Sequence, residues 1–381
     1  MSREKNIRID FRDRRWTVLF ILCGIAIILF VLLLIRLPLQ QREMDMGDEE
    51  KMPLLLKPEK RYDMSLPEAR RSYPMGSLIL ELSSEQILLR DFQGKIVYAD
   101  RSDLIRPAAL DCGRTMLVGD RESGRLILLS SQGKIFDAQI EGSFAGGDYN
   151  GRSSAAVILE VPEKNSQVLL LDLKGTPLFT LEFAESGNPI RVSFTPDGQA
   201  LDILILNTNG NELKTYIKRY DLKGVQLAQK QIEDYPDLFT GLLHDLQGNL
   251  ILYSPTHVLK LALDQELPLI SEEFSAIAGV FPHGNSLSVV AASHQDGSYT
   301  IYELNENENA QESGIRIGAS PILHPYGAGF AAASGNRLSV YDPRSGKLIR
   351  EGLLDGEILR IDDEGDFLNI LTEQGAEWLR P

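Results

Sequence analysis

A tight turn of one kind recurs along this sequence and constrains its fold more than any other feature. Its clearest copies are Asp172-Leu173-Lys174-Gly175 and Asp221-Leu222-Lys223-Gly224. The aspartate can accept hydrogen bonds from the backbone of the turn, and glycine readily adopts the positive φ that tight hairpins need. Looser copies follow one another about every 40–45 residues between Gly94 and Gly346. This period, with several short apolar runs per unit, is typical of a β-propeller blade.

One repeat divides into four predicted strands, which are residues 189–194, 200–206, 213–220 and 225–232. The run from Leu201 to Leu206 is apolar almost throughout, as expected where both faces of a sheet are covered. We therefore predict an all-β domain over residues 75–381, folded as a β-propeller of four-stranded blades. Roughly 305 residues divided by about 43 residues per blade gives close to seven. Seven blades are favoured, and eight is the alternative.

The two ends of the repeat array are incomplete in opposite ways. The first unit, with strands expected between Leu78 and Tyr98, lacks a first strand. The last unit, with strands expected between Ile358 and Leu379, lacks a fourth strand. A propeller is a closed ring without exposed sheet edges between blades. We therefore expect the two ends of the domain to complete the same blade or adjoining blades.

The first fifty residues differ in composition from the repeats. Residues 1–15 form a short charged tail, and the twenty residues from Trp16 to Ile35 carry no charge. At a rise of about 1.5 Å per residue, such a helix spans about 30 Å, the thickness of the hydrocarbon core of a bilayer. We predict a transmembrane helix over 16–36, acting as an uncleaved signal anchor, and a Pro-rich, charged linker over 37–74.

The flanks of this segment predict its orientation. The fifteen residues before it hold six Lys or Arg, and the fifteen after Ile35 hold two. Positively charged flanks stay in the cytoplasm. We therefore expect a single-pass protein of the cell membrane, with a cytoplasmic N-terminus and an extracytoplasmic propeller over 75–381.

The charge of the chain restricts its partners. The net charge is −15, and residues 1–36 carry seven basic and three acidic groups, so the remainder carries −19. A domain this acidic repels phosphates, which excludes nucleic acid as a partner. Apart from the membrane that the single span crosses, the expected partners are proteins, peptides or glycans of the cell envelope.

Few residues suggest chemistry. His244, His283 and His324 come from successive repeats, each near the turn after a first strand, so they could gather on one rim of the central channel. Their offsets from the next glycine differ, which favours ordinary turn residues, although a shared site stays open. The acidic runs 305–309 and 362–366 do not follow the alternating calcium-loop pattern and are expected to be solvated turns. We predict no catalytic, cofactor-binding or metal-binding residues and no cofactor.

The segment from Leu338 to Lys347 resembles the third-strand motif of YVTN-type and WD-repeat-like propellers. Together with the basic tail, the single span and the repeated turns, the layout resembles an uncharacterised family of membrane-anchored propellers from Firmicutes. No Trp-Asp dipeptide ends any predicted third strand, so the partners of WD-repeat proteins do not carry over. The resemblance implies a surface-exposed, non-enzymatic binding or scaffold module.

The alternative is an extracytoplasmic enzyme with its site in the central channel, similar to propeller lactonases or quinoproteins. Quinoprotein propellers resemble one another in a tryptophan-bearing blade motif, whereas this chain has only Trp16 and Trp378. No Gly-x-Ser-x-Gly nucleophile motif is present. The sequence therefore favours a binding protein over an enzyme.

Overall fold

The computed structural model describes residues 54–55, 58–161, 166–183, 187–208, 213–233, 235, 237–292, 298–306, 308–327, 329–342 and 347–380. The tail, the predicted transmembrane segment and the linker up to residue 53 lie outside these residues. Within the described part of the chain, no helix has the length and apolar character needed to cross a membrane.

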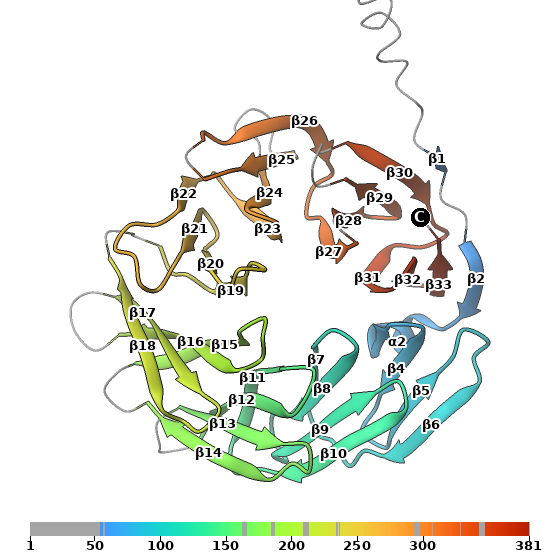
Figure 1. Ribbon diagram of the computed structural model, residues 1–381. Helices are drawn as coiled ribbons and strands as arrows, with labels where there is room; N and C mark the ends of the chain where they lie inside the picture. The colour runs from blue at the N-terminus through green and yellow to red at the C-terminus, as the bar shows by residue number, and fades with distance from the viewer. Residues whose placement is uncertain are drawn as a thin grey trace, which may run out of the picture. The chain divides into compact units, whose positions relative to one another are not determined.

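Eight antiparallel sheets stand side by side in a ring (Figure 1). Blade 1 consists of β3 (Ser72–Met75), β4 (Leu78–Leu82), β5 (Gln86–Arg90) and β6 (Ile96–Arg101). Blade 2 consists of β7 (Pro107–Asp111), β8 (Thr115–Asp120), β9 (Arg125–Ser130) and β10 (Gly133–Gln139). Blade 3 consists of β11 (Ser143–Tyr149), β12 (Ser154–Glu160), β13 (Gln167–Asp172) and β14 (Pro177–Glu182). Blade 4 consists of β15 (Asn188–Phe194), β16 (Ala200–Asn207), β17 (Lys214–Asp221) and β18 (Gln226–Ile232).

The second half of the ring repeats this order. Blade 5 consists of β19 (Gly241–His244), β20 (Leu250–Tyr253), β21 (His257–Leu261) and β22 (Ile270–Glu273). Blade 6 consists of β23 (Ile277–His283), β24 (Ser286–Ala292), β25 (Tyr299–Leu304) and β26 (Gln311–Ile317). Blade 7 consists of β27 (Ile322–Tyr326), β28 (Gly329–Ser334), β29 (Arg337–Tyr341) and β30 (Leu348–Leu353), with β1 (Leu54–Leu55) added in parallel to β30.

Blade 8 is built from both ends of the domain. It consists of β31 (Ile358–Glu364), β32 (Phe367–Thr372), β33 (Gly375–Leu379) and, outermost, β2 (Pro58–Asp63). The strand β2 pairs antiparallel with β33, as Figure 1 shows where the blue and red segments meet. The expectation that the two ends of the array join in one closed ring is confirmed.

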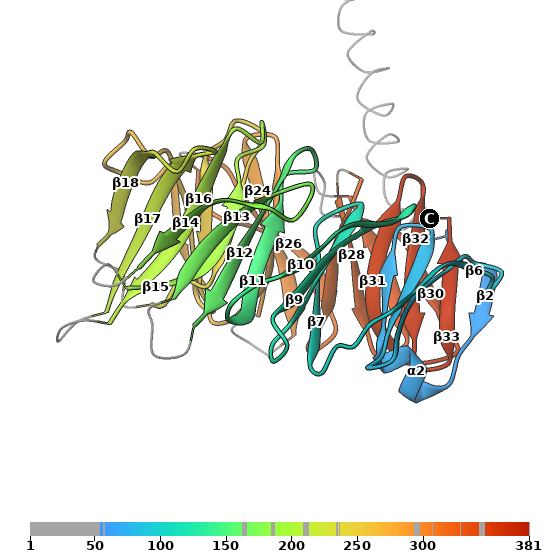
Figure 2. The same cartoon turned by 90° about the horizontal axis from the view of Figure 1, so that it is seen from below.

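The expected count of seven blades is wrong, because the ring has eight. The missing strands are β2 and β3, which lie in the segment 37–74 that we interpreted as a linker, so the propeller begins before residue 75. Prolines in this segment argued against strands. However, β2 and β3 lie at the outer and inner edges of their sheets, where a missing N–H leaves no ladder bond unmade. A short helix, α2 (Leu66–Arg70), connects them at one rim of the ring (Figure 2).

Burial along the strands follows their place in the blade. All six residues of β8 are buried, and so are the first six of β16, which confirms the prediction for the run from Leu201 as far as Ile205. The outermost strands β6 and β14 alternate between exposed and half-buried positions. The apolar core of the described chain forms eight clusters, each between two neighbouring blades. Each blade is therefore stabilised mainly by its neighbours.

The two clearest repeated turns have the predicted geometry. Asp172 Oδ1 accepts hydrogen bonds from the backbone N–H groups of Lys174 and Thr176, both at 2.8 Å. In the next copy, Asp221 Oδ1 accepts corresponding bonds from residues 223 and 225 at 2.9 and 2.8 Å. The φ angles of Gly175 and Gly224 are 74° and 84°, so the predicted positive φ is confirmed.

The glycine of these turns also allows close packing between neighbouring blades. In four consecutive blades, an aromatic ring from the outermost strand of the preceding blade covers the turn glycine. The pairs are Tyr62 with Gly94, Tyr98 with Gly133, Phe136 with Gly175, and Phe179 with Gly224. A Cβ on Gly224 would lie 3.2 Å from the ring of Phe179. The turn therefore requires glycine both for its backbone conformation and for the ring beside it.

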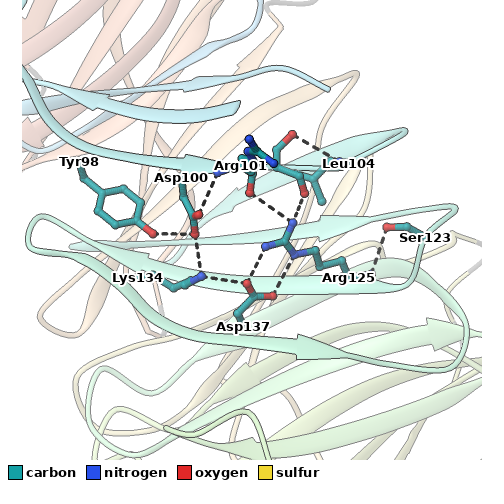
Figure 3. Close-up of polar contacts among 9 residues, drawn as sticks. Tyr98, Asp100, Arg101, Leu104, Ser123, Arg125, Lys134 and Asp137 are labelled. Carbon is teal, nitrogen blue, oxygen red and sulfur yellow. Dashed lines mark hydrogen bonds and ion pairs between the residues drawn. The ribbon is translucent and has the colours of Figure 1, made fainter. Parts of the chain in front are cut away.

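An ionic network adds a contact between the outer strands of blades 1 and 2 (Figure 3). Asp100 on β6 accepts a hydrogen bond from Lys134 Nζ on β10 at 2.7 Å, and Lys134 also contacts Asp137 at 3.0 Å. Arg125 on β9 forms an ion pair with Asp137 at 2.7 Å and reaches back to the carbonyl of Ser102. Since these side chains are partly exposed, each pair contributes at most about 1 kcal/mol.

The contact between the Tyr62 side chain and Gly94 allows a first test of whether β2 closes the propeller. Gly94 and Gly113 have almost the same φ, 75° and 76°, but a Cβ on Gly94 would overlap the ring of Tyr62, whereas a Cβ on Gly113 would meet nothing within 4 Å. Alanine at either position costs about 1–2 kcal/mol of backbone strain. We expect Gly94→Ala to lower the free energy of unfolding by a further 1–3 kcal/mol or so. Urea denaturation of both full-length variants measures the difference, and equal losses would contradict the contact with β2.

Asp120, at the end of β8, holds the connection between blades 1 and 2 in place. Its side chain is fully buried and accepts bonds from the N–H groups of Ile105 and Arg106, at 2.6 and 2.9 Å, and from the Ser123 hydroxyl at 2.6 Å. Burial by itself raises the pKa of Asp120, but these hydrogen bonds outweigh it and hold the pKa at about 2.

This lowered pKa predicts a pH dependence of stability. An aspartate has a pKa of about 3.9 in the unfolded chain, so Asp120 contributes about 2–3 kcal/mol that is present above pH 4 and lost as the pH falls through 2. We expect Asp120→Asn to lower the free energy of unfolding at pH 7 by at least this amount. The gap between wild type and variant should narrow between pH 4 and pH 2 in urea titrations. A gap that stays constant with pH would show that the charge of Asp120 contributes nothing.

Candidate functional site

The inner strands bring polar side chains to one face of the ring. In each blade the first and third strands run in the same direction, so the turns after them lie on the same face. We call this the hairpin face; it carries turns such as 245–249 and 221–224. His244 and His283 are the last residues of the inner strands β19 and β23, and His324 lies in the inner strand β27. The predicted placement near the turn after the first strand is confirmed for these histidines.

His244 belongs to a network that joins blades 4 and 5. Its Nε2 lies 2.7 Å from Asp202 Oδ2, and its Nδ1 lies 3.3 Å from the hydroxyl of Ser193. Asp202 is fully buried and accepts two further bonds from Arg219, at 2.8 and 2.7 Å. The residue types are those of a serine–histidine–aspartate relay. Because Asp202 is also bound by Arg219, we interpret the network as a structural contact between blades 4 and 5.

His283 is held within blade 6. Its Nε2 contacts the Ser288 hydroxyl at 2.7 Å and Glu303 Oε2 at 3.0 Å. The Ser288 hydroxyl in turn donates to Glu303 Oε1 at 2.6 Å. His244 and His283 therefore contact different carboxylates, Asp202 and Glu303, and do not share a ligand.

A large cavity opens beside the first two histidines. Its volume is about 1270 Å³, and it is lined by inner strands and turns of blades 4 to 7, including Ser193, His244, Leu246, His283 and Glu303. Leu246, in the turn after β19, is 82% exposed. Amide side chains at its border, such as those of Asn285 and Asn305, can donate and accept hydrogen bonds. A mixed lining of this kind suits a ligand with both apolar and polar groups.

His324 belongs to a different group, which crosses the place where the ring closes. Its Nε2 lies 2.9 Å from Asp363 Oδ1 and 3.7 Å from Asp362 Oδ1. One oxygen of Asp111, at the end of β7, lies within 4.8 Å of Asp362 and of the ring of His324. These side chains come from blades 2, 7 and 8. We call Asp111, His324 and Asp362 the seam cluster.

The two aspartates of the seam cluster differ in exposure, since Asp362 is only 5% exposed whereas Asp111 is exposed. Burial, followed by the charge of Asp111, raises the pKa of Asp362 to about 6. The surrounding protein and the charge of Asp363 likewise raise the pKa of Asp111 to about 6, against one lowering hydrogen bond from the N–H of Gly113. Asp362 Oδ2 also accepts a hydrogen bond from the N–H of Gly76 at 2.6 Å. Two neighbouring carboxylates in such surroundings favour either a proton or a cation.

The sequence did not predict the seam cluster. We expected residues 362–366 to form a solvated turn, but Asp362 and Asp363 belong to β31, and Asp362 is only 5% exposed. Asp111 carries no motif, and only closure of the ring brings it near His324. Asp111 is the last residue of its inner strand and His324 lies in the middle of its own, so no local signal in the sequence connects them.

No curated protein matches the sequence. Two solved structures show a similar fold. BamB from Moraxella catarrhalis is 13% identical, with a TM-score of 0.56, over 85% of this chain and 99% of BamB. Sqt1 from Saccharomyces cerevisiae is 10% identical, with a TM-score of 0.59, over 86% of this chain and 99% of Sqt1.

At these identities the similarity shows the fold alone, a β-propeller. A family match covers residues 57–310, from β2 to the edge of β26. The chain thus belongs to the family of unknown function DUF5711.

Proposed function

We propose that this chain is a membrane-anchored binding module without catalytic activity, whose propeller lies outside the cytoplasm and binds a protein or peptide in the cell envelope. The uncharged segment from Trp16 to Ile35 and the excess of basic residues before it support the anchor and its orientation. The pairing of His244 with Asp202 and of His283 with Glu303 supports a binding role over an acid–base role.

The cavity on the hairpin face is the observation that carries the proposed binding role. An isolated exposed leucine is common on protein surfaces. Leu246, however, stands at 82% exposure on the border of a cavity of about 1270 Å³ that also presents Glu303 and Asn305. Apolar anchors surrounded by polar groups are typical of protein-binding sites. The net charge of −19 after residue 36 favours a partner segment that carries basic residues.

Labelling of introduced cysteines tests the proposed orientation. Leu267 lies in the connection after β21 and is 78% exposed, so Leu267→Cys should react with a membrane-impermeant maleimide on intact cells without a wall. Ser2→Cys should react only after lysis. The parent chain, which keeps Cys23 and Cys112, measures the background. The reverse pattern would place the propeller in the cytoplasm.

Photo-crosslinking tests the binding surface. A benzophenone amino acid in place of Leu246 should give a discrete protein adduct in intact membranes, because this position borders the cavity. The same amino acid in place of Leu267 is a matched control. It lies in the same blade at almost equal exposure but between the third and fourth strands, and it does not line the cavity. No adduct at position 246, or the same adduct at both positions, would contradict a protein ligand in this cavity.

A further inference from the structure

We infer that the seam cluster, formed by Asp111, His324 and Asp362, is a binding site for a divalent transition-metal cation of the Zn²⁺ and Mn²⁺ class. The inference does not rest on the proposed binding function. It differs from our expectation that the chain has no metal-binding residues.

The ligand atoms of the three side chains lie close together. One carboxylate oxygen of Asp111, one of Asp362 and a ring nitrogen of His324 all lie within 4.8 Å of one another. They project from three inner strands, β7, β31 and β27, whose positions are fixed by the ring. Two carboxylate oxygens and one imidazole nitrogen form a mixed ligand set. Such a set suits Zn²⁺ or Mn²⁺ better than Ca²⁺ or Mg²⁺, which prefer ligand sets made of oxygen alone.

A second observation comes from a buried, unsatisfied oxygen on the residue that pairs with Asp362. Asn369 lies directly across from Asp362 in the β31–β32 pair and is 1% exposed. Its Nδ2 donates to the carbonyls of Gly76 and Leu78 at 2.8 and 2.9 Å, which fixes the orientation of the amide. Its Oδ1 has no hydrogen-bond donor among the described residues. Buried oxygens are nearly always satisfied, and an amide oxygen is a good metal ligand.

Asn369 and Asp362 also face the same neighbour. The N–H of Gly76 donates to Asp362 Oδ2 at 2.6 Å, while the carbonyl of Gly76 accepts from Asn369. The turn after β3 therefore holds both side chains on the blade-1 side of blade 8. This contact provides a supporting shell for the ligands, and such shells orient metal ligands in known sites.

The seam cluster borders a cavity that can hold a cation, and its carboxylates supply negative charge. A cavity of about 260 Å³ is lined by Asp111 and Asp362, so water can complete the coordination. Arg360 lines the same cavity, but its guanidinium lies 4.4 Å from the centre of the Tyr73 ring. Within the described ranges, no ion pair joins Arg360 to either aspartate. The pair of carboxylates is thus balanced by at most one histidine.

A cation here would connect blades 2, 7 and 8 around blade 1, whose inner strand β3 has only four residues. This is the part of the ring that depends on the two ends of the domain. Because the ligands are brought together only in the closed ring, cation binding favours the folded state over the unfolded chain.

Metal titration of the full-length protein, purified in detergent with a chelator that is then removed, tests the site. We expect Zn²⁺ or Mn²⁺ to bind in calorimetry at one strong site per chain and to raise the melting temperature. Asp111→Asn and His324→Gln should each weaken binding at least about tenfold and reduce the thermal shift. Since Asp111 is exposed and holds only the turn at Gly113, its variant should still fold.

His283→Gln is the matched control, because His283 lies on an inner strand of the same ring and contacts Glu303 instead. It should keep the affinity and the thermal shift of the wild type. Binding that is lost equally in His283→Gln, or unchanged in both seam variants, would overturn the site. Tight binding of Ca²⁺ or Mg²⁺ in preference to Zn²⁺ and Mn²⁺ would overturn the cation class, and no binding of any of the four at millimolar concentration would overturn both.

Discussion

The pairing of β2 with β33 is the interaction on which the rest of the structure depends. Seven blades are formed by consecutive strands, but the eighth has only three strands from the C-terminal end of the chain. The strand β2 supplies the fourth, in register from Pro58 opposite Leu379 to Asp63 opposite Gly375. Without it, β33 would be an open edge that presents unpaired backbone groups. The same strand carries Tyr62, which covers Gly94 in blade 1.

Closure matters because the apolar core lies between the blades and not within them. Each of the eight clusters is shared by two neighbours, so a blade on its own would expose both faces of its middle strands. The turn glycines show the same dependence of one blade on its neighbour, because an aromatic ring from the outermost strand of the preceding blade covers them. Repeat proteins that stay open lose stability one unit at a time. In a ring, the loss of one contact surface exposes apolar area on two blades at once.

The ring also explains where functional groups can gather. All inner strands run in the same direction, so the residues at their ends meet on the hairpin face around the axis. In blades 4 to 7 the inner strands and their turns line a large cavity, and the histidines of blades 5 and 6 are satisfied by Asp202 and Glu303. At the seam, the carboxylates of Asp111 and Asp362 approach each other with His324 as their only close basic partner in the described chain. The cavity of blades 4 to 7 is therefore suited to binding a protein or peptide, whereas the seam cluster is suited to binding a cation.

The sequence by itself determined the all-β class, the propeller repeat and the strands of complete blades. These follow from local chemistry: the Asp-to-backbone bonds and positive φ of turns such as 172–175, and the apolar runs of middle strands such as β16. Sequence reasoning missed β2 and β3, because edge strands need few ladder bonds and tolerate the prolines that signalled a linker. Tertiary structure alone decided the count of eight blades and the meeting of Asp111, His324 and Asp362. Both depend on the closure of the ring, which is set by how many twisted sheets pack face to face before the first meets the last.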